Sequence, residues 1–478
     1  MTLSVFEAAR AAPLAEALLC EGERFTFQAL AARVQARCAE LEGIGLCSER
    51  ARPVALLVDG SVRMFELLHA LIALGIPVLP IHPRLTAPER AHLLQLSAAQ
   101  TLLDPSQTEP AQPVNVEWRQ PPVPDEQALA LVPTSGSTGM PKLTVLSRRA
   151  FAALARADAQ RIAPSPEDRA LLCLPLSHVG GLSVVLRCLA ARRCCVVFRG
   201  SKPSLLESTA ELAQTVIDER ITLLSLVPTV LARLLREVPN LGQRARLRAL
   251  LLGGQACSEA LFLAAREQGL PVLTSYGLTE TCSQASTLAF PPPAQVSARQ
   301  GVVSVGFPLP GVELRVVQGL IEVRGPTLFS GYVGEPSALA GDGFFHTGDR
   351  GELDPEHGLF VFGRASELII TGGENVDPSE VEHALLACGG LGSVFVFGIP
   401  DAEFGARVAA VLEPLPGAPF DERSLFAALD LRLASFKQPR AVCIVEALPR
   451  LASGKLDRAR IREEIAPKLR PADRDGRR

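Results

Sequence analysis

Short apolar runs rich in β-branched residues alternate with stretches of helical length between residues 53 and 274. The pattern predicts strands at 53–58, 170–174, 194–198, 221–226, 250–252 and 271–274, and helices at 61–74, 181–191, 205–219, 228–235 and 258–267. Such alternation is typical of α/β proteins, in which mostly parallel sheets are covered by helices. Runs such as CCVVF are apolar at every position because a parallel strand is buried on both faces.

The pattern changes twice in the second half of the chain. After residue 301, short strands separated by glycine turns predict a β-rich subdomain that ends near residue 363. A new α+β pattern follows, with helices at 378–386 and 422–433 and strands at 394–397 and 441–445. The tail from residue 467 is polar, and we expect it to be frayed. We therefore predict a large N-terminal domain, residues 1–365, and a small C-terminal domain, residues 366–478.

Composition narrows the class of protein. Of the 478 residues, 47% are apolar, which supports a large core, and the net charge of −3 without a basic cluster argues against a nucleic-acid partner. The longest apolar stretch, 67–81, is too short and too interrupted to span a bilayer, and no signal peptide is visible. The eleven cysteines have neither CxxC nor zinc-site spacing, so we expect reduced thiols and a cytoplasmic protein.

Residues 134–142, TSGSTGMPK, have the composition of a phosphate-binding loop. A P-loop places its lysine directly after a glycine and a hydroxyl residue directly after the lysine. Here Met140 and Pro141 separate Gly139 from Lys142, and Leu143 follows, so this is not a P-loop. Small residues would still let backbone amides and hydroxyls approach phosphate oxygens. The stretch taken alone leaves open a plain Ser/Gly connector between strands.

Four further motifs follow in order: YGLTE at 276–280, TGD at 347–349, GR at 363–364 and PRLASGK at 449–455. With TSGSTGMPK they span about 320 residues and resemble the adenylate-forming superfamily of acyl-CoA synthetases, luciferases and peptide-synthetase adenylation domains. The resemblance covers essentially the whole chain and implies a small, mobile C-terminal domain. It also implies that a carboxylate attacks the α-phosphate of ATP, giving an acyl-adenylate and pyrophosphate, and that a thiol then releases AMP.

The resemblance assigns residues to ATP and Mg²⁺. The phosphate loop comprises Thr134, Ser135, Gly136, Ser137, Thr138, Gly139 and Lys142, and the adenosine site comprises Gly253, Gly254, Tyr276, Asp349 and Arg364. A carboxylate such as Asp349 can accept hydrogen bonds from both ribose hydroxyls. Glu280 suits Mg²⁺, which prefers oxygen ligands, and Thr279 would donate to the α-phosphate.

Lys455 and the segment around the domain boundary complete the implied machinery. In the superfamily the lysine of PxxxxGK stabilises the charge that develops during adenylation. The small domain then rotates about a hinge, here Ser366, where many relatives have Asp or Lys. Rotation would bring the segment Gly372, Gly373 and Glu374 to the CoA thiol. Lys437 lies either near the CoA phosphates or merely on the surface.

Residues 178–187, HVGGLSVVLR, bear on the identity of the acid. They resemble the o-succinylbenzoate–CoA ligases of menaquinone biosynthesis, in which an arginine at this spacing faces the second carboxylate of the substrate. The resemblance places His178 near the reacting carboxylate and Arg187 at the second one. From their positions shortly after YGLTE, Ser283 and Thr287 are candidates to add hydroxyls near the substrate. A buried carboxylate needs a cation or several donors, which a fatty-acid tunnel would avoid.

Three alternatives remain at this point: another aryl- or acyl-CoA ligase, a free-standing adenylation enzyme that loads a carrier protein, and a non-catalytic nucleotide-binding protein. The last predicts missing charged residues, yet Glu280, Asp349, Arg364 and Lys455 are all present. The expected partners are a small carboxylic acid, ATP and CoA, without nucleic acid or a membrane span, and a homodimer is left open.

Overall fold

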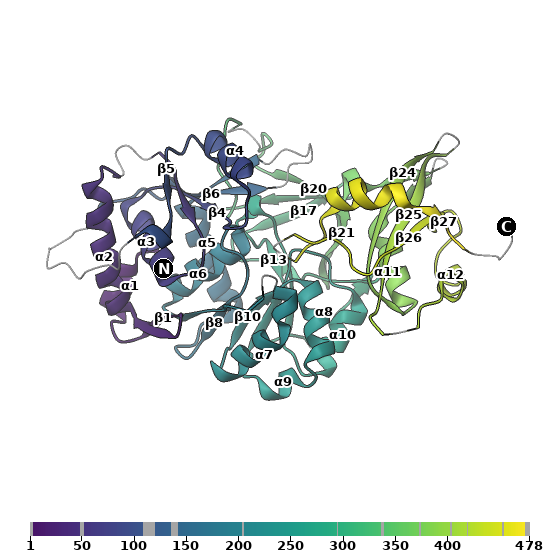
Figure 1. Ribbon diagram of the computed structural model, residues 1–478, viewed down its shortest axis with the longest axis horizontal. Coiled ribbons are helices and arrows are strands. Elements are labelled where there is room, and N and C mark those ends of the chain that lie inside the picture. The colour runs from purple at the N-terminus through teal and green to yellow at the C-terminus, as the bar shows by residue number, and fades with distance from the viewer. Residues whose placement is uncertain are drawn as a thin grey trace.

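The computed structural model describes residues 3–47, 52–108, 120–134, 142–202, 205–293, 295–335, 339–371, 374–401, 404–417, 419–451 and 454–473. Figure 1 shows a large N-terminal part, coloured purple to green, beside a smaller C-terminal part in yellow-green and yellow. Among the helices of these ranges, none combines the length and the apolar character that a membrane crossing requires.

A nine-stranded sheet with a parallel centre forms one half of the N-terminal part. Its strand order is β16-β13-β12-β11-β10-β8-β9-β1-β2, and the five neighbours from β12 to β9 all pair in parallel. These five are β8 (Arg169–Leu172), β9 (Cys194–Val197), β10 (Leu223–Leu226), β11 (Ala249–Leu252) and β12 (Val272–Tyr276). The helices that cover them are α5 (Arg148–Ile162), α6 (Val179–Ala191), α7 (Thr209–Asp218), α8 (Pro228–Glu237) and α10 (Glu259–Glu267). The predicted α/β class is confirmed.

A second, six-stranded sheet has the order β19-β7-β6-β4-β3-β5. Its strands are β3 (Val54–Leu57), β4 (Val78–Ile81), β5 (Thr101–Leu103), β6 (Ala128–Thr134), β7 (Lys142–Ser147) and β19 (Gly331–Tyr332). Strand β3 and helix α3 (Val62–Leu74) lie where the sequence predicted them, whereas β4, which follows α3, was not predicted. Helix α3 begins where the Ser61 hydroxyl accepts a hydrogen bond from the Met64 amide, and it ends at Gly75, whose φ of 70° suits glycine.

The predicted β-rich segment is an antiparallel sheet of four strands, in the order β17-β18-β20-β21. Its strands are β17 (Glu313–Val317), β18 (Leu320–Arg324), β20 (Phe345–Asp354) and β21 (Gly358–Arg364). The register of β20 and β21 sets Asp349 directly opposite Arg364, so a local pairing joins two motifs that are 15 residues apart in the sequence.

The C-terminal part has a sheet of its own, in the order β23-β22-β25-β26-β27, with β24 paired to β25. Its strands are β22 (Ile369–Thr371), β23 (Glu374–Val376), β24 (Leu391–Asp401), β25 (Gly405–Pro414), β26 (Ala441–Ile444) and β27 (Arg470–Pro471). Helices α11 (Pro378–Ala387) and α12 (Glu422–Asp430) pack on it. Helix α11 begins at Pro378, as the predicted helix at 378–386 does, and it is capped by Asp377, whose carboxylate accepts a hydrogen bond from the Ser379 amide at 2.9 Å.

The expectation of a frayed tail from residue 467 is wrong for β27. Residues Arg470 and Pro471 pair with Val442 and Ala441 of β26, and the Arg470 guanidinium forms an ion pair with Glu422 on α12. The polar sequence misled because an edge strand needs no apolar face to pair through its backbone.

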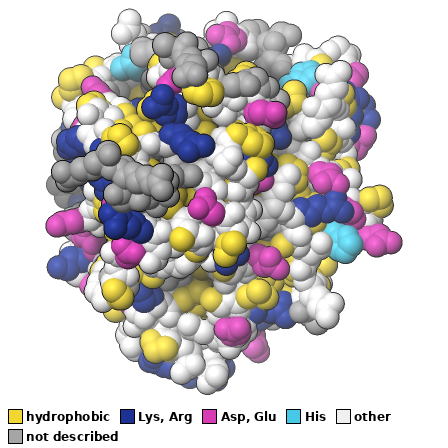
Figure 2. Space-filling model, turned by 90° about the vertical axis from the view of Figure 1, so that its right-hand side faces the viewer, with side chains coloured by type: hydrophobic (Ala, Val, Ile, Leu, Met, Phe, Trp, Pro, Cys, Tyr) yellow, Lys and Arg dark blue, Asp and Glu magenta, His cyan; other side chains and the backbone are white. Residues whose placement is uncertain are grey.

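Figure 2 shows the face of the molecule at its C-terminal end, where acidic and basic side chains are interspersed. This mixture agrees with a net charge of −3 spread over the chain rather than gathered by sign.

Candidate active site

The carboxyl ends of three neighbouring parallel strands meet at one edge of the large sheet. Strands β10, β11 and β12 end at Leu226, Leu252 and Tyr276, and the Gly253–Gly254 pair and the YGLTE motif follow directly. Ligands of open α/β sheets bind at this edge. Lys455 reaches it from the C-terminal part, because a Cβ added to Gly254 would lie 3.1 Å from the lysine Cε and 3.4 Å from its Nζ.

Lys455 lies among other cations at this edge. Burial lowers the pKa of its ammonium group, and the positive charges of Arg364 and Arg458 lower it further. The loop that carries it is attached to α8, since the Thr229 hydroxyl donates to the Gly454 carbonyl at 3.1 Å. A buried ammonium among like charges is stabilised by an anion, so this position favours a phosphate or carboxylate group.

Gly254 is a position where a small change should displace Lys455. Its φ is 80°, and an added Cβ would contact the lysine, so Gly254→Ala is expected to slow adenylate formation by ~10- to 100-fold through misplacement of the cation. Pyrophosphate exchange measures that rate. Gly22→Ala is the matched control, because Gly22 has the same φ of 80° with no atom within 4 Å of an added Cβ. Both variants should lose similar stability, and an equal loss of activity in both would contradict the prediction.

Asp349, Arg364 and Tyr276, predicted for the adenosine site, form one hydrogen-bonded group. Arg364 Nε lies 2.8 Å from Asp349 Oδ1, and the Tyr276 hydroxyl donates to Asp349 Oδ2 at 2.7 Å. Burial raises the pKa of Asp349, although Arg364 and Tyr276 act in the opposite direction. A carboxylate has about four acceptor positions, so Asp349 retains lone pairs for two ribose hydroxyls.

Asp349→Asn is expected to raise the KM for ATP by ~10- to 100-fold, because a charged acceptor shared by Arg364 and Tyr276 would become a neutral amide. Pyrophosphate exchange at varied ATP concentration measures this. Glu352→Gln on the same strand is the control, since Glu352 is exposed and forms a surface ion pair with Arg299. A KM for ATP that stays at the wild-type value in Asp349→Asn would remove Asp349 from the site.

Glu280, the predicted magnesium ligand, is oriented by two contacts. The Tyr332 hydroxyl donates to Glu280 Oε1 at 2.8 Å, and the Phe329 amide donates to its backbone carbonyl at 2.9 Å. Within the described ranges, no group of three or more His, Cys, Asp or Glu side chains could hold a metal ion by itself. Mg²⁺ is often bound by one or two carboxylates together with substrate phosphates, so Glu280 fits that role with ATP.

Sequence reasoning missed Tyr332 and Glu335. Lys142 Nζ lies 3.0 Å from Glu335 and 4.9 Å from the centre of the Tyr332 ring. The rarity of tyrosine could have indicated Tyr332. The chain has two tyrosines, and the hydroxyls of both donate to carboxylates of this site.

The phosphate loop and the glycines of the CoA segment lie outside the described residues: Ser135, Gly136, Ser137, Thr138, Gly139, Gly372 and Gly373. The ends of the phosphate loop are described. Thr134 ends β6 directly opposite Lys142, which begins β7. Thr279 begins the short turn that contains Glu280, while Ser366 and Glu374 are exposed. Lys437 Nζ lies 2.7 and 2.8 Å from the two carboxylate oxygens of Glu380, so its charge is balanced within the C-terminal part.

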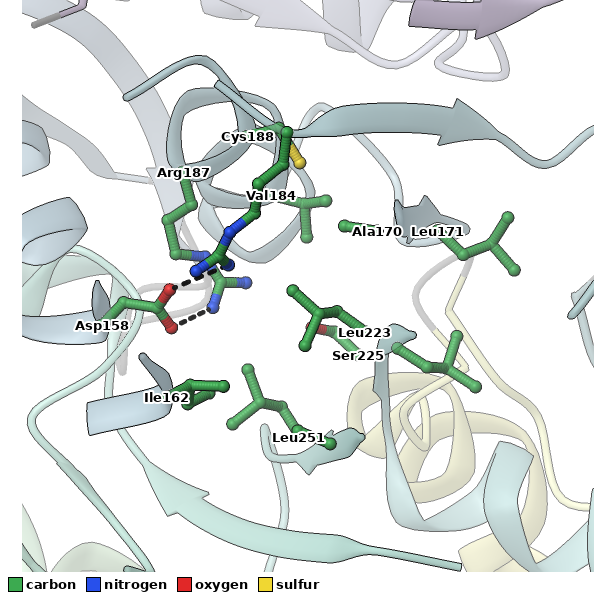
Figure 3. Close-up of a pocket in the computed structure, with 13 residues that line it drawn as sticks. Asp158, Ile162, Ala170, Leu171, Val184, Arg187, Cys188, Leu223, Ser225 and Leu251 are labelled. Atoms are coloured by element: carbon green, nitrogen blue, oxygen red, sulfur yellow. Dashed lines mark hydrogen bonds and ion pairs between the residues drawn. The ribbon is translucent and has the colours of Figure 1, made fainter. Parts of the chain in front are cut away.

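A cavity lies between the parallel strands β8, β10 and β11 and the helices α5 and α6, and the ion pair of Arg187 with Asp158 forms one side of it (Figure 3). The Arg187 side chain is only 11% exposed, and its Nη1 lies 2.9 Å from Asp158 Oδ1 and 3.3 Å from Gln284 Oε1. Arg187 is therefore not a solvated helix position but a buried cation on the wall of a largely apolar cavity, paired with Asp158.

Ser283 and the glycine of YGLTE connect this cavity to the nucleotide edge. The Ser183 hydroxyl on α6 donates to the Ser283 hydroxyl at 3.4 Å, and Arg187 Nε donates to the Ser183 carbonyl at 3.3 Å. Gly277 packs so closely that an added Cβ would lie 1.9 Å from the Ser283 carbonyl oxygen. Ser283 and Arg187, both predicted for the acid, thus belong to one contact network.

His178 immediately precedes α6, and its side chain makes no capping hydrogen bond. Desolvation, followed by the positive charges of Lys455 and His82, lowers the pKa of His178 to about 4. The imidazole is therefore neutral near pH 7, so it can donate or accept a hydrogen bond at the site without adding a charge beside Lys455.

Comparison with known proteins agrees with this geometry. Residues 5–333 match the AMP-binding enzyme family, and residues 380–455 match the AMP-binding enzyme C-terminal domain. The chain therefore belongs to the AMP-binding enzymes, the adenylate-forming class that its motifs predicted.

Within that class the chain is similar to 2-succinylbenzoate–CoA ligases. It is 32% identical to the ligase of Bacillus licheniformis over an alignment of 470 residues, and this alignment covers 92% of this chain and 94% of that protein. The structure of o-succinylbenzoate CoA synthetase from Bacillus subtilis with its acyl-adenylate intermediate matches with a TM-score of 0.83 and 29% identity, over 96% of this chain and 97% of that one. The Bacillus subtilis enzyme with ATP and a magnesium ion matches with a TM-score of 0.82 and 28% identity, over 96% and 98%.

Proposed function

We propose that this chain is an AMP-forming acid–CoA ligase that converts 2-succinylbenzoate to its CoA thioester at the expense of ATP, a step of menaquinone biosynthesis. The observation that carries the choice of acid is the buried Arg187 in a cavity that is otherwise mainly apolar. A dicarboxylic aromatic acid supplies both the apolar surface and the second anion that such a cavity favours. The similarity to ligases named for this substrate supports the proposal.

In the first half-reaction a carboxylate oxygen of the acid attacks the α-phosphorus of ATP, and pyrophosphate leaves. Asp349 and Arg364 would hold the ribose, and Lys455 would neutralise charge on the attacking carboxylate and the α-phosphate. His178, neutral near pH 7, would orient the reacting carboxylate, and Thr279 would donate to the α-phosphate. Glu280 would hold Mg²⁺ together with phosphate oxygens of ATP, and the ion would neutralise charge on the departing pyrophosphate.

In the second half-reaction the CoA thiol attacks the acyl carbon, and AMP leaves. We propose a boundary between residues 365 and 366, with rotation of the small domain about Ser366. That rotation must break the contacts seen here, including the Thr229–Gly454 hydrogen bond and the ion pair at 2.7 Å between Arg350 and Asp377. Glu374 and its neighbouring glycines would then replace Lys455 at the acyl carbon, while Lys437 would have to leave Glu380 to contact CoA.

We also propose a cytoplasmic location, which the spacing of the eleven cysteines favours, since it matches neither a disulfide-rich secreted domain nor a zinc site. Association into a homodimer stays a prediction that light scattering can test.

A panel of acids tests the substrate. Purified protein is incubated with ATP, Mg²⁺, CoA and one acid at a time, and CoA thioester and AMP are quantified. We expect the highest kcat/KM with 2-succinylbenzoate. Faster turnover of a benzoate or a fatty acid would assign the chain to another acyl-CoA ligase, and adenylate formation without transfer to free CoA would favour loading of a carrier protein.

A further inference from the structure

Arg187 is not the only cation of the acid cavity. Arg193, which follows α6, also lines it and is only 3% exposed. Its closest charged neighbours are distant for ion pairs: Nη1 lies 3.9 Å from Asp158 Oδ2, and Nε lies 3.6 Å from Asp168 Oδ2. Among the described residues, neither Nε nor Nη2 of Arg193 has a hydrogen-bond acceptor. Buried guanidinium N–H groups are normally paired, so this arrangement points to an acceptor supplied from outside the chain.

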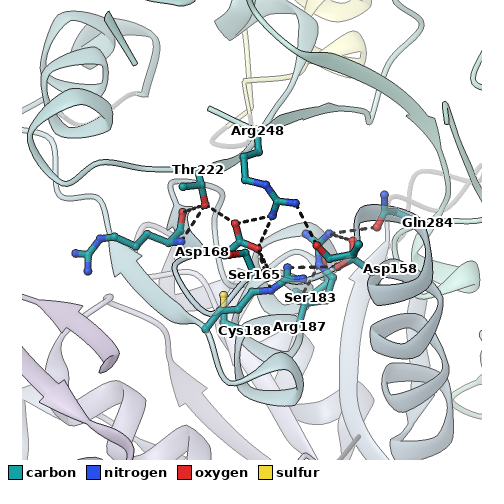
Figure 4. A network of polar contacts seen from close by, with 12 residues as sticks. Asp158, Ser165, Asp168, Ser183, Arg187, Cys188, Thr222, Arg248 and Gln284 are labelled. Carbon is teal, nitrogen blue, oxygen red and sulfur yellow. Dashed lines mark hydrogen bonds and ion pairs between the residues drawn. The ribbon is translucent and has the colours of Figure 1, made fainter. Parts of the chain in front are cut away.

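The two carboxylates nearest to Arg193, those of Asp158 and Asp168, form shorter ion pairs with other arginines. Asp158 Oδ1 lies 2.9 Å from Arg187 Nη1. Both carboxylate oxygens of Asp168 accept hydrogen bonds from Arg248 Nη1, each at 2.8 Å. Asp168 also accepts from the Thr222 hydroxyl and the Ser165 amide, at 2.9 and 2.8 Å. Figure 4 shows this network, with Arg248 above Asp168 and with Arg187 beside Asp158. Arg193 thus lies between two carboxylates that are oriented toward other cations.

The buried charges of this cluster balance in number, with the guanidinium groups of Arg187 and Arg193 against the carboxylates of Asp158 and Asp168. The third guanidinium group, that of Arg248, is 30% exposed and therefore partly solvated. An acceptor from outside the chain is therefore indicated by the N–H groups of Arg193 that lack a partner among the described residues, and not by net charge.

We propose that Arg193 is a specificity residue for the second carboxylate of the acid, acting beside Arg187 on the same anion. Asp158, which contacts both arginines from α5, holds the two guanidinium groups toward the cavity. The inference rests on the proposed function, because it requires that a dicarboxylic acid be the substrate. It makes the preference for a dicarboxylate depend on two cations rather than one.

Arg193→Gln tests this with 2-succinylbenzoate and with the two monocarboxylate analogues that each lack one of its carboxyl groups. We expect kcat/KM for 2-succinylbenzoate to fall by ~10- to 100-fold, mainly through KM, because a hydrogen bond to a charged group is lost. The analogue that keeps only the reacting carboxylate should change by less than ~3-fold, since it makes no such bond. An equal loss on both acids, or no loss on either, would overturn the inference.

Arg248→Gln is the matched control for a merely structural role of the cluster. It removes the principal partner of Asp168 but does not line the cavity, so the protein should lose stability while the ratio of kcat/KM between the two acids stays at the wild-type value. If Arg248→Gln changes that ratio as much as Arg193→Gln does, the effect belongs to the cluster and the inference fails.

If Arg193→Gln does not fold, Arg193→Lys tests whether Arg193 binds the second carboxylate. Lysine keeps the charge but lacks the planar pair of donors, so we expect KM for the dicarboxylic acid to rise by ~3- to 10-fold and KM for the monocarboxylate to stay constant. Equal KM changes for both acids would refute the assignment. A wild-type enzyme without any preference for 2-succinylbenzoate would instead refute the proposed substrate, which separates the two failures.

Discussion

Lys455→Ala is expected to lower the rate of acyl-adenylate formation by at least ~10²- to 10³-fold, the loss typical when one preorganised donor to a developing charge is removed. A large loss is expected because of the environment of the Lys455 ammonium group. The ammonium group is buried at the edge of the large sheet, against Gly254, where Arg364 and Arg458 add positive potential. Single-turnover formation of the adenylate, measured by quenched flow with labelled ATP, reports this step separately from product release.

One control variant and two further measurements separate a catalytic role of Lys455 from a general loss of function. Lys468→Ala is the control, because Lys468 is an exposed lysine of the same C-terminal part and should leave the rate unchanged. Binding of ATP, measured by calorimetry, should persist in Lys455→Ala, since the proposed nucleoside contacts of Asp349 and Arg364 are unchanged. Thioester formation from a chemically prepared adenylate should also persist, because the proposed rotation removes Lys455 from the site before that step. A variant that keeps wild-type adenylation would exclude Lys455 as the catalytic cation.

The order of strands and helices was largely predictable, because parallel strands and their covering helices differ in period and length. Helix α3 and its cap at Ser61 follow from local sequence, as does α11 with its cap at Asp377. Strand β27 was missed because its pairing with β26 depends on long-range contacts and leaves no pattern of its own.

Sequence motifs identified candidate site residues, but they could not identify residues that join the site only through tertiary contacts. Asp349 and Arg364, which the motifs assigned together to the adenosine site, are in contact because they lie opposite each other on β20 and β21. Asp158 was missed because it is an acid within an ordinary helix, 29 residues before Arg187 in the sequence. Only packing of α5 against α6 makes it the counter-ion of that arginine, so no spacing rule could reveal it.

Arg187→Leu is expected to lower kcat/KM for 2-succinylbenzoate by about 10²-fold or more, because the cation proposed to bind the second carboxylate is lost. The monocarboxylate analogue that retains only the reacting carboxylate should lose far less, so the preference between the two acids should fall by nearly the same factor. CoA-thioester formation with both acids, at varied acid concentration, measures this. An unchanged preference would show that Arg187 does not face the substrate.

Loss of stability must be separated from loss of recognition in Arg187→Leu. Among the described residues, the substitution leaves Asp158 one ion pair, the longer contact to Arg193 at 3.9 Å, and breaking one side of a buried ion pair costs about 3–5 kcal/mol. Adding Asp158→Asn removes the uncompensated carboxylate, so the double variant should regain part of the lost thermal stability. It should not regain the preference for the dicarboxylic acid, because neither substitution restores a cation at the position of Arg187. Recovery of stability without recovery of preference would identify Arg187 as a recognition residue rather than a structural one.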